Sequence, residues 1–252
     1  MSTHLLTSGI GTRRPNISFF SRLAAIAVAD ERSFKQLQTW GIDNSFLVRP
    51  GINIARFSHT PCPLHSEIKL MVGSAPWTKA QFRSKGIDAL LEAAQQAPHL
   101  RLIFLWRGVL GEEMNRRIQK MNLEKQVTVL DKFVDVNAIL ADVHASITLA
   151  DAPGLVKSYP HSLLDSLAAG KPVLISQAIP MADYVAETGC GQVIDRVTPT
   201  DILIAVEALA SKYEARQKIA RRVGRRDFSQ QALVTSYQRV YEQVLDTFNQ
   251  TK

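Results

Sequence analysis

The sequence has few cysteines and no long apolar run. Its 252 residues include only Cys62 and Cys190, which lie far apart and have no neighbouring His or Asp at the spacing of metal ligands. Neither a disulfide framework nor a zinc site is therefore expected. No stretch approaches the roughly 18 uninterrupted apolar residues of a membrane-spanning helix, and residues 1–15 lack the apolar centre of a signal peptide. These absences predict a cytoplasmic protein with reduced thiols and no bound metal.

Positive charge is in excess, with a formal net charge of +7. This excess favours anionic partners, such as nucleotide phosphates, nucleic acid or an acidic membrane surface. Nucleic acid is not expected, because the chain has no base-reading motif and no interleaved aromatic residues. The densest basic stretch is interpreted as spread around a helix, which favours a solvated helix. Contact with anionic lipid at the inner face of the membrane is the alternative. The stretch contains Arg216, Lys218, Arg221, Arg222, Arg225 and Arg226.

Apolar runs of strand length alternate with segments of helical period through most of the chain. The expected strands are Leu23–Ala29, Ile68–Ser74, Leu100–Trp106, Val127–Leu130, Ala145–Ala150, Pro172–Ser176 and Gln192–Asp195. The expected helices are Asp30–Trp40, Ser84–Ala97, Gly111–Met121, Val136–Ala141, His161–Ala169, Met181–Glu187 and Pro199–Ala210. This alternation predicts an α/β fold in which a Rossmann-like parallel sheet carries helices on both faces.

Turn residues between Gly41 and Ser66 indicate a joint in the chain. Residues 1–60 hold one expected strand and one helix, which cannot close a sheet of their own. Residues 61–198 supply six strands and form the Rossmann-like domain. Residues 199–252 are helices that pack on it or near it. In their last part an apolar stripe is expected to be buried, consisting of Phe228, Leu233, Tyr237, Tyr241 and Leu245.

The segment Lys157–Val173 carries the clearest chemistry. It follows an expected strand, turns at Pro160, opens a helix that ends at Gly170, and enters the next strand at Pro172. The start of a helix directly after a parallel strand binds anions, because its N–H groups are unpaired and the helix dipole favours negative charge. A diphosphate is therefore the expected ligand.

By these residues the sequence resembles glycosyltransferase family 4 and its GT-B relatives. The helix end Ala168–Val173 matches the family's small-residue, Gly-Lys-Pro-Val ending, and Asp165 stands at its second acidic position. The resemblance implies that the Asp165 carboxylate accepts hydrogen bonds from the ribose hydroxyls of a nucleotide. Lys157 stands where the family has its first acidic residue, so the charge near the donor sugar is reversed.

Two further segments carry the resemblance. Val48–Phe57 is similar to the family's interdomain passage, and Val72–Gly73 with Lys85–Leu90 is similar to the first strand and helix of its donor domain. The resemblance implies that Lys85 neutralises the donor diphosphate. Ser74 occupies the place of the family's usual arginine, so Lys79 or Arg83 would have to substitute for it.

The resemblance implies a donor-binding pocket and assigns no catalytic residue. His161 alone, without a positioned carboxylate, is weak evidence for acid–base catalysis. Lys132–Val134 resembles the family's segment that flanks the nucleobase with backbone groups, and Phe133 itself is either a platform for the base or, as is more common, a core residue. The expected pocket residues are Gly73, Ser74, Lys85, Arg107, Phe133, Lys157, Ser158, Tyr159, Pro160, His161, Ser162, Leu163 and Asp165.

The expected function is that of the C-terminal, donor-binding half of a GT-B glycosyltransferase. The donor would be a UDP-, GDP- or ADP-linked hexose, transferred with retention of the anomeric configuration, and no other cofactor is expected. Residues 1–60 would be a remnant of the N-terminal domain and the linker. The acceptor half would then be a missing N-terminal domain or a separate subunit. The alternative is a noncatalytic nucleotide-sugar-binding or interaction domain whose site is degenerate at Lys157.

Overall fold

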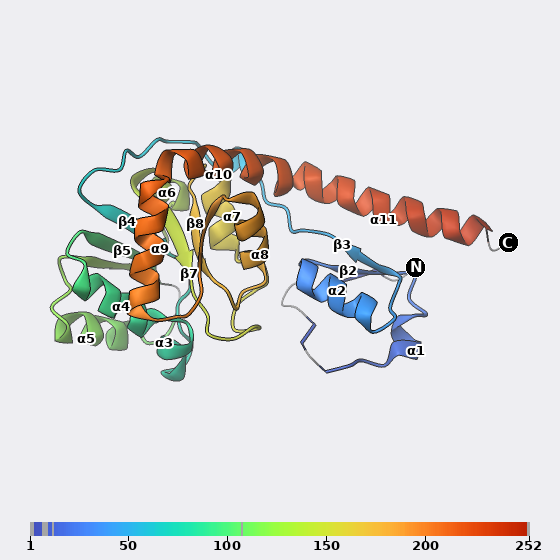
Figure 1. The fold of residues 1–252 in the computed structure, drawn as a ribbon, viewed down its shortest axis with the longest axis horizontal. Helices are drawn as coiled ribbons and strands as arrows, with labels where there is room; N and C mark the ends of the chain where they lie inside the picture. The colour runs from blue at the N-terminus through green and yellow to red at the C-terminus, as the bar shows by residue number, and fades with distance from the viewer. Residues whose placement is uncertain (1–2, 7–9, 12, 107, 251–252) are drawn as a thin grey trace.

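The chain folds into two α/β parts joined by a linker (Figure 1). The structure is a computed structural model that describes residues 3–6, 10–11, 13–106 and 108–250. The N-terminal part has a three-stranded sheet and the C-terminal part a six-stranded sheet, and both are parallel. The strands are β1 (Thr3–Leu6), β2 (Ala25–Val28), β3 (Ser45–Leu47), β4 (Ile68–Val72), β5 (Leu100–Leu105), β6 (Val127–Leu130), β7 (Ala145–Thr148), β8 (Val173–Ser176) and β9 (Gly191–Ile194).

The larger sheet has the strand order β6-β5-β4-β7-β8-β9. The chain adds strands on one side of β4 and then continues on the other side from β7, so the order reverses between these two strands. Such a reversal leaves a crevice at the carboxyl ends of the central strands. All six strands match the expected ranges to within about two residues, and the Rossmann-like α/β fold is confirmed.

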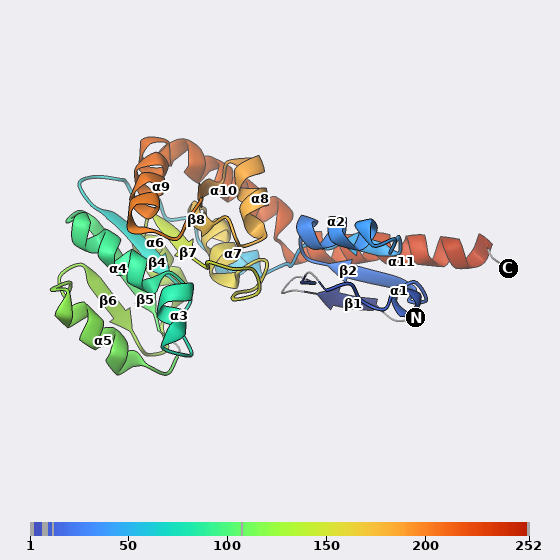
Figure 2. The same ribbon diagram turned by 60° about the horizontal axis from the view of Figure 1, so that its bottom comes forward.

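Helices cover both faces of the larger sheet (Figure 2). In β4, Ile68, Leu70 and Val72 point into one hydrophobic layer, and Met71 points into the layer on the opposite face. The first layer is covered by α3 (Ala80–Ser84), α4 (Ile87–Gln96), α5 (Gly111–Lys120) and α9 (Pro199–Ser211). The second layer is covered by α6 (Val136–Asp142), α7 (His161–Ala168), α8 (Met181–Thr188) and α10 (Tyr213–Asp227).

One expected helix is broken in the structure. The range Ser84–Ala97 was expected to form a single helix, but α3 ends at Ser84 and α4 begins at Ile87. Gly86 lies between them with φ +67°, a left-handed conformation that only glycine adopts without strain. A Cβ atom added there would lie 2.6 Å from the Val197 side chain and 2.8 Å from that of Leu149. The break therefore depends on glycine, and it leaves Lys85 at the end of α3.

The N-terminal part has more structure than the sequence indicated. One strand and one helix were expected, whereas β1, β2 and β3 form a parallel sheet with α1 (Ile17–Phe20) and α2 (Glu31–Thr39). β3 has only three residues and lies in the turn-rich stretch, so it shows no hydrophobic period of its own. Ile26 and Val28 of β2 pack against Leu37 of α2.

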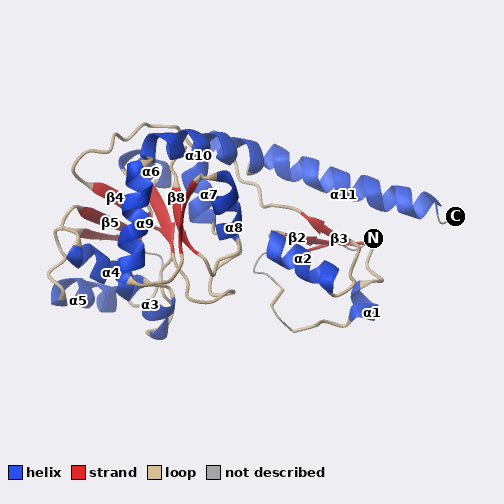
Figure 3. Cartoon of the chain, in the orientation of Figure 1, coloured by secondary structure: helices blue, strands red, loops and turns tan. Residues whose placement is uncertain are grey.

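The last helix, α11 (Gln230–Gln250), runs along the N-terminal sheet (Figures 1 and 3). Val240, with the partly buried Leu233 and Tyr237, packs against Ala25 and Ala27 of β2. The expected stripe is therefore correct for Phe228, Leu233 and Tyr237. It is wrong for Tyr241 and Leu245, which are 45% and 51% exposed because the described part of the sheet does not reach them. The division of the chain at residues 60 and 198 stays a prediction.

The two parts are held together by polar contacts, by the packing of Ala29 against the C-terminal part, and by the chain itself. Arg32 of α2 forms an ion pair with Asp183 of α8, with an N–O distance of 2.6 Å. The Tyr159 hydroxyl donates a hydrogen bond to the Glu31 carboxylate at 3.2 Å. The linker also contains a short 3-10 helix, η1 (Ile54–Arg56), before it reaches β4.

The basic residues of α10 form one stripe, which corrects the expectation that they spread around the helix. Arg216 lies on the inner side and donates a hydrogen bond to the Gln192 side chain at 2.6 Å. The other five are exposed and recur at intervals of three and four residues, which places them on one side of an α-helix. We call this stripe the cationic face; it consists of Lys218, Arg221, Arg222, Arg225 and Arg226. None of the described helices is long and apolar enough to cross a bilayer.

Candidate functional site

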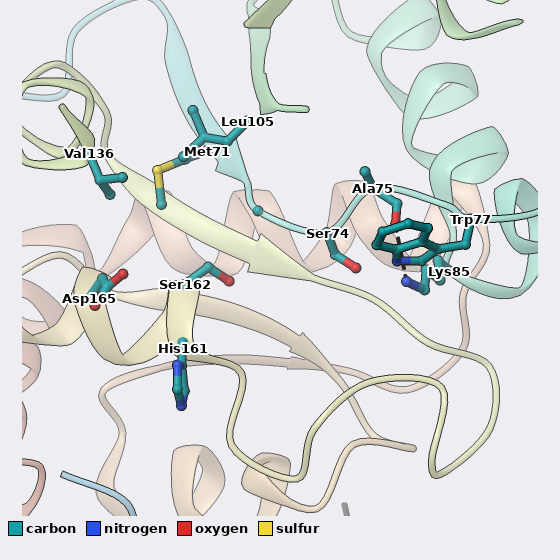
Figure 4. Close-up of a pocket in the computed structure, with 11 residues that line it drawn as sticks. Met71, Ser74, Ala75, Trp77, Lys85, Leu105, Val136, His161, Ser162 and Asp165 are labelled. Carbon is teal, nitrogen blue, oxygen red and sulfur yellow. Dashed lines mark hydrogen bonds between the residues drawn. The ribbon is translucent and has the colours of Figure 1, made fainter. Parts of the chain in front are cut away.

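A pocket opens at the carboxyl ends of β4 and β5 and at the start of α7, beside the point where the strand order of the larger sheet reverses (Figure 4). Its volume is about 340 Å³. Residues from the end of β4, from the loop after it and from the start of α7 face one another across this space. The lining residues are Met71, Gly73, Ser74, Ala75, Trp77, Lys85, Leu105, Val136, His161, Ser162 and Asp165.

Close packing between the end of β4 and the start of α7 forms the centre of the pocket. A Cβ atom added to Gly73 would lie 2.5 Å from the Ser162 Cβ, so only glycine permits this approach. The Ser74 and Ser162 side chains lie between the two ends of the pocket (Figure 4). The site therefore offers two hydroxyl groups at the place where the sheet and the helix meet.

The first turn of α7 faces the same space. Pro160 is the N-cap residue, and among the described residues no side chain caps this helix. The first N–H groups of an α-helix have no partner inside the helix, so those of His161 and Ser162 are available to a ligand. Asp165 follows one turn later on the same side and lines the pocket. The turn thus combines N–H donors with a carboxylate acceptor.

Lys85 supplies a buried positive charge. Its side chain is 7% exposed, and its Nζ donates a hydrogen bond to the Ala75 carbonyl at 3.1 Å. Burial lowers the pKa of the Lys85 ammonium. Within the described part of the chain no carboxylate forms an ion pair with it. An uncompensated cation beside the start of a helix favours the binding of an anion.

His161 is the first residue of α7, and Lys157 lies in the loop just before this helix. Burial, and after it the charge of Lys157, lower the pKa of the His161 imidazole, so its neutral form is favoured at pH 7. Lys157 itself is exposed and does not line the pocket. Its charge therefore acts on His161 from outside the pocket.

Several residues expected in the pocket lie elsewhere. Ser158, Tyr159 and Leu163 are buried in the packing between α7, α8 and the N-terminal part, so their side chains do not line the pocket. Pro160 is also buried and acts as the N-cap of α7. Phe133 is 96% exposed and lies outside the lining.

The proposed substitutes for the missing arginine are not in the lining either. Lys79 and Arg83 are exposed side chains on α3 and at its start. Arg107 lies outside the described residues. Of the expected pocket residues, the structure thus brings together Gly73, Ser74, Lys85, His161, Ser162 and Asp165.

Sequence reasoning missed the apolar lining and Trp77. Met71 and Leu105 are strand residues that point toward α6. In the sequence they are indistinguishable from ordinary core residues of a buried strand. The sequence position of Trp77 could have indicated its place, because the loop directly after the first strand of a Rossmann-like domain lies close to the crevice. The structure shows that it lines the pocket.

Metal ligands are not grouped in the part of the chain that the structure describes, where no cluster of three or more His, Cys, Asp or Glu could hold an ion. Cys62 is half-buried and Cys190 buried, and both are unpaired. The groups that face the pocket are therefore one cation, one carboxylate, one imidazole, two hydroxyls and the first N–H groups of α7.

Comparison with known proteins gives two matches in sequence. The family model described as "Glycosyl transferases group 1" matches residues 77–226, more than half of the chain. The lipopolysaccharide glucosyltransferase WaaG of Escherichia coli (strain K12) is 30% identical over 135 residues, which make up 50% of this chain and 32% of that protein. The chain thus spans about a third of the length of this curated relative.

Solved structures match the fold of nearly the whole chain. Anabaena Alr3699/HepE in complex with UDP superposes with a TM-score of 0.75 at 14% identity, covering 97% of this chain and 72% of that one. Sucrose-phosphate synthase (tll1590) from Thermosynechococcus elongatus gives a TM-score of 0.72 at 15% identity, covering 92% and 61%. At sequence identities this low, the comparison shows a shared fold only.

Proposed function

Because the chain belongs to the group 1 glycosyl transferases, we propose that it is the donor-binding half of a GT-B enzyme that transfers a hexose from a nucleotide diphosphate sugar with retention. The observation that carries the proposal is the meeting of Lys85, the first turn of α7 and Asp165 in one pocket at the switch point. Membership of family 4 within this group stays a prediction.

The polar groups of the pocket suit the parts of such a donor. Two ribose hydroxyls donate hydrogen bonds to one ionised carboxylate, and Asp165 provides that acceptor. The diphosphate lies between the Lys85 ammonium and the N–H groups of His161 and Ser162. When the bond from the sugar to the diphosphate breaks, negative charge develops on the leaving phosphate. A preorganised cation and helix N-terminus stabilise that charge most strongly in the transition state.

The base of the donor is proposed from the structural neighbours. Anabaena Alr3699/HepE has been solved with UDP, with UDP and glucose, and with UDP-glucose. Uridine is therefore the first nucleoside to test, with guanosine and adenosine as alternatives. Met71, Leu105 and Val136 form the apolar end of the pocket that would receive the base.

Thermal unfolding with and without nucleotides tests the proposal. A ligand present at 100 times its Kd stabilises the folded chain by about 2.7 kcal/mol, which raises Tm by roughly 5–10 °C at this chain length. We expect such a rise with one of UDP, GDP or ADP, and we expect Asp165→Ala to abolish it. Asp195→Ala is the matched control, because Asp195 is exposed and lies outside the pocket lining. No rise with any nucleotide in a folded sample would contradict the proposal.

Binding without transfer would favour the noncatalytic alternative. The substitution of Lys157 for an acidic residue is the feature that motivates this alternative. The acceptor half, as an N-terminal domain or a separate subunit, has to be supplied before transfer is measured. Saturable donor binding with no sugar transfer to any acceptor under those conditions would indicate a degenerate site.

We also propose peripheral contact of the cationic face with anionic lipid. Its five exposed basic residues lie on one side of α10, with Arg226 ion-paired to Asp227, and a basic residue near an anionic bilayer contributes about 1 kcal/mol. Replacing Arg221 and Arg225 together with glutamine is expected to weaken binding to phosphatidylglycerol vesicles by about 30-fold in co-sedimentation. The matched control replaces Lys120 and Lys125, which are exposed near the end of α5. Equal binding by both double variants would show that the cationic face is only a solvated surface.

A further inference from the structure

Trp77 presents an unusually open aromatic surface to the pocket. Its side chain is 63% exposed, whereas Trp106 is 1% exposed and belongs to the core. Trp77 stands in the loop between β4 and α3 and lines the same space as Lys85. A large apolar ring left in water at the edge of a pocket gains free energy when a ligand covers it.

The loop holds the backbone of Trp77 in place before any ligand binds. The Trp77 backbone N–H donates a hydrogen bond to the Gln81 side-chain oxygen at 2.7 Å. The Gln81 N–H donates in turn to the Thr78 carbonyl at 3.1 Å. Pro76, directly before Trp77, is buried and fixes one backbone angle of the loop. An ordered backbone reduces the conformational entropy that this residue loses when a ligand covers its ring.

The order of groups along the pocket identifies what would cover the ring. Asp165 and the apolar residues lie at one end, Ser162 and Ser74 lie in the middle, and Trp77 lies with Ala75 and Lys85 at the other end (Figure 4). A donor whose ribose contacts Asp165 and whose diphosphate reaches Lys85 places its nucleoside away from Trp77. The group that continues past the diphosphate at Lys85 is the sugar.

We propose that Trp77 is the stacking platform for the pyranose ring of the donor sugar. The inference rests on the proposed function and assigns to Trp77 the hexose part of the ligand. One face of a hexopyranose carries axial C–H groups and packs flat against an aromatic ring, while the hydroxyls at its rim stay available to polar groups. Ser74 and Lys85 are the polar lining residues drawn nearest to Trp77, so they are placed to take such hydroxyl contacts (Figure 4).

Calorimetric titration of the full chain with matched ligand pairs tests this inference. The pairs are UDP with UDP-glucose, GDP with GDP-mannose, and ADP with ADP-glucose. For the pair that binds, Trp77→Ala is expected to lower the affinity for the nucleotide sugar by about tenfold and to leave that for the free nucleotide unchanged. Trp77→Phe keeps an aromatic face and is expected to retain most of the affinity. Phe19→Ala is the matched control, because Phe19 is an exposed aromatic residue on α1, outside the pocket lining.

Tryptophan fluorescence provides a second readout. The nucleotide sugar is expected to shift the emission of the unchanged chain, and free nucleotide to shift it less. In Trp77→Ala, where Trp40 and Trp106 remain, the shift should be lost.

Each outcome decides between the two proposals. Equal losses of affinity for nucleotide and nucleotide sugar in Trp77→Ala would assign the ring to the nucleoside and overturn the inference, as would no loss for either ligand. Both results leave the proposed function in place, because the nucleotide still binds the unchanged chain. If the unchanged chain binds no nucleotide at all, the proposed function is overturned and this inference falls with it.

Discussion

Replacing Lys85 with methionine is expected to weaken nucleotide binding by about 100-fold without destabilising the fold. A hydrogen bond from a charged group to an anion contributes roughly 1.5–3 kcal/mol, and the upper end of that range corresponds to about 100-fold in Kd. Methionine keeps the length of the buried side chain but removes its charge. Because burial lowers the pKa of the Lys85 ammonium, the charged form opposes folding, and its loss should leave the free energy of unfolding unchanged or slightly higher.

The combination of lost binding with retained stability separates this result from misfolding. Titration with the nucleotide found in the thermal screen gives Kd, and urea unfolding gives stability. Lys79→Met is the matched control, because Lys79 belongs to the same loop region but is exposed and does not line the pocket. Equal affinities for Lys85→Met and the unchanged chain would show that the buried charge does not contact the diphosphate.

Gly86→Ala is expected to lower the free energy of unfolding by about 2–5 kcal/mol. A non-glycine residue in the left-handed region costs about 1–2 kcal/mol, and forcing a methyl group into a packed core adds roughly 1–3 kcal/mol. At Gly86 both terms apply, since φ is +67° and the new Cβ would meet Val197 and Leu149 at less than 3 Å. Urea denaturation followed by circular dichroism measures the loss.

Gly41→Ala isolates the backbone term. Gly41 has a similar φ of +76°, and nothing lies within 4 Å of an added Cβ. We expect a loss of about 1 kcal/mol there, so the difference between the two variants reports the steric contacts at the α3–α4 break. Losses of equal size at both glycines would mean that the core accommodates the methyl group and that the break does not depend on packing.

The strands of the larger sheet could be predicted from apolar runs in the sequence, because these strands are buried on both faces. Ala145–Thr148 and Val173–Ser176 are fully buried, and such runs stand out between helical segments. The break at Gly86 was missed because the residues on either side of it keep a helical pattern. β3 was missed because its three residues sit among turn formers and gain their stability from pairing with β2. In both cases the structure is decided by contacts between segments distant in sequence.

Only part of the pocket could be predicted, because the direction of a side chain also depends on contacts between segments distant in sequence. Lys85 and Asp165 were identified by motif, and the structure places both in the pocket. Tyr159 lies in the same motif, but its ring points to the opposite side of the chain and its hydroxyl reaches Glu31 in the N-terminal part. A motif gives the spacing of residues along the chain but not which sides of a turn face the ligand. Trp77 shows the converse, since it belongs to none of the motifs and only its position in the loop after β4 could have indicated that it would lie beside the pocket.

The two segments that cross between the N-terminal and C-terminal parts lie side by side, at residues 51–52 and 228–230. The Ile52 N–H donates to the Phe228 carbonyl at 2.8 Å, and the Gln230 N–H donates to the Ile52 carbonyl at 3.1 Å. Gly51 packs so closely here that an added Cβ would lie 2.7 Å from the Ser229 carbonyl oxygen. The two chain segments that join the N-terminal and C-terminal parts are therefore hydrogen-bonded to each other where they cross, and the Arg32–Asp183 ion pair is a second point of attachment, farther along the boundary between the parts. Because α11 also packs on β2, the helix that leaves this crossing covers the N-terminal sheet, so the end of the chain completes the core of its beginning.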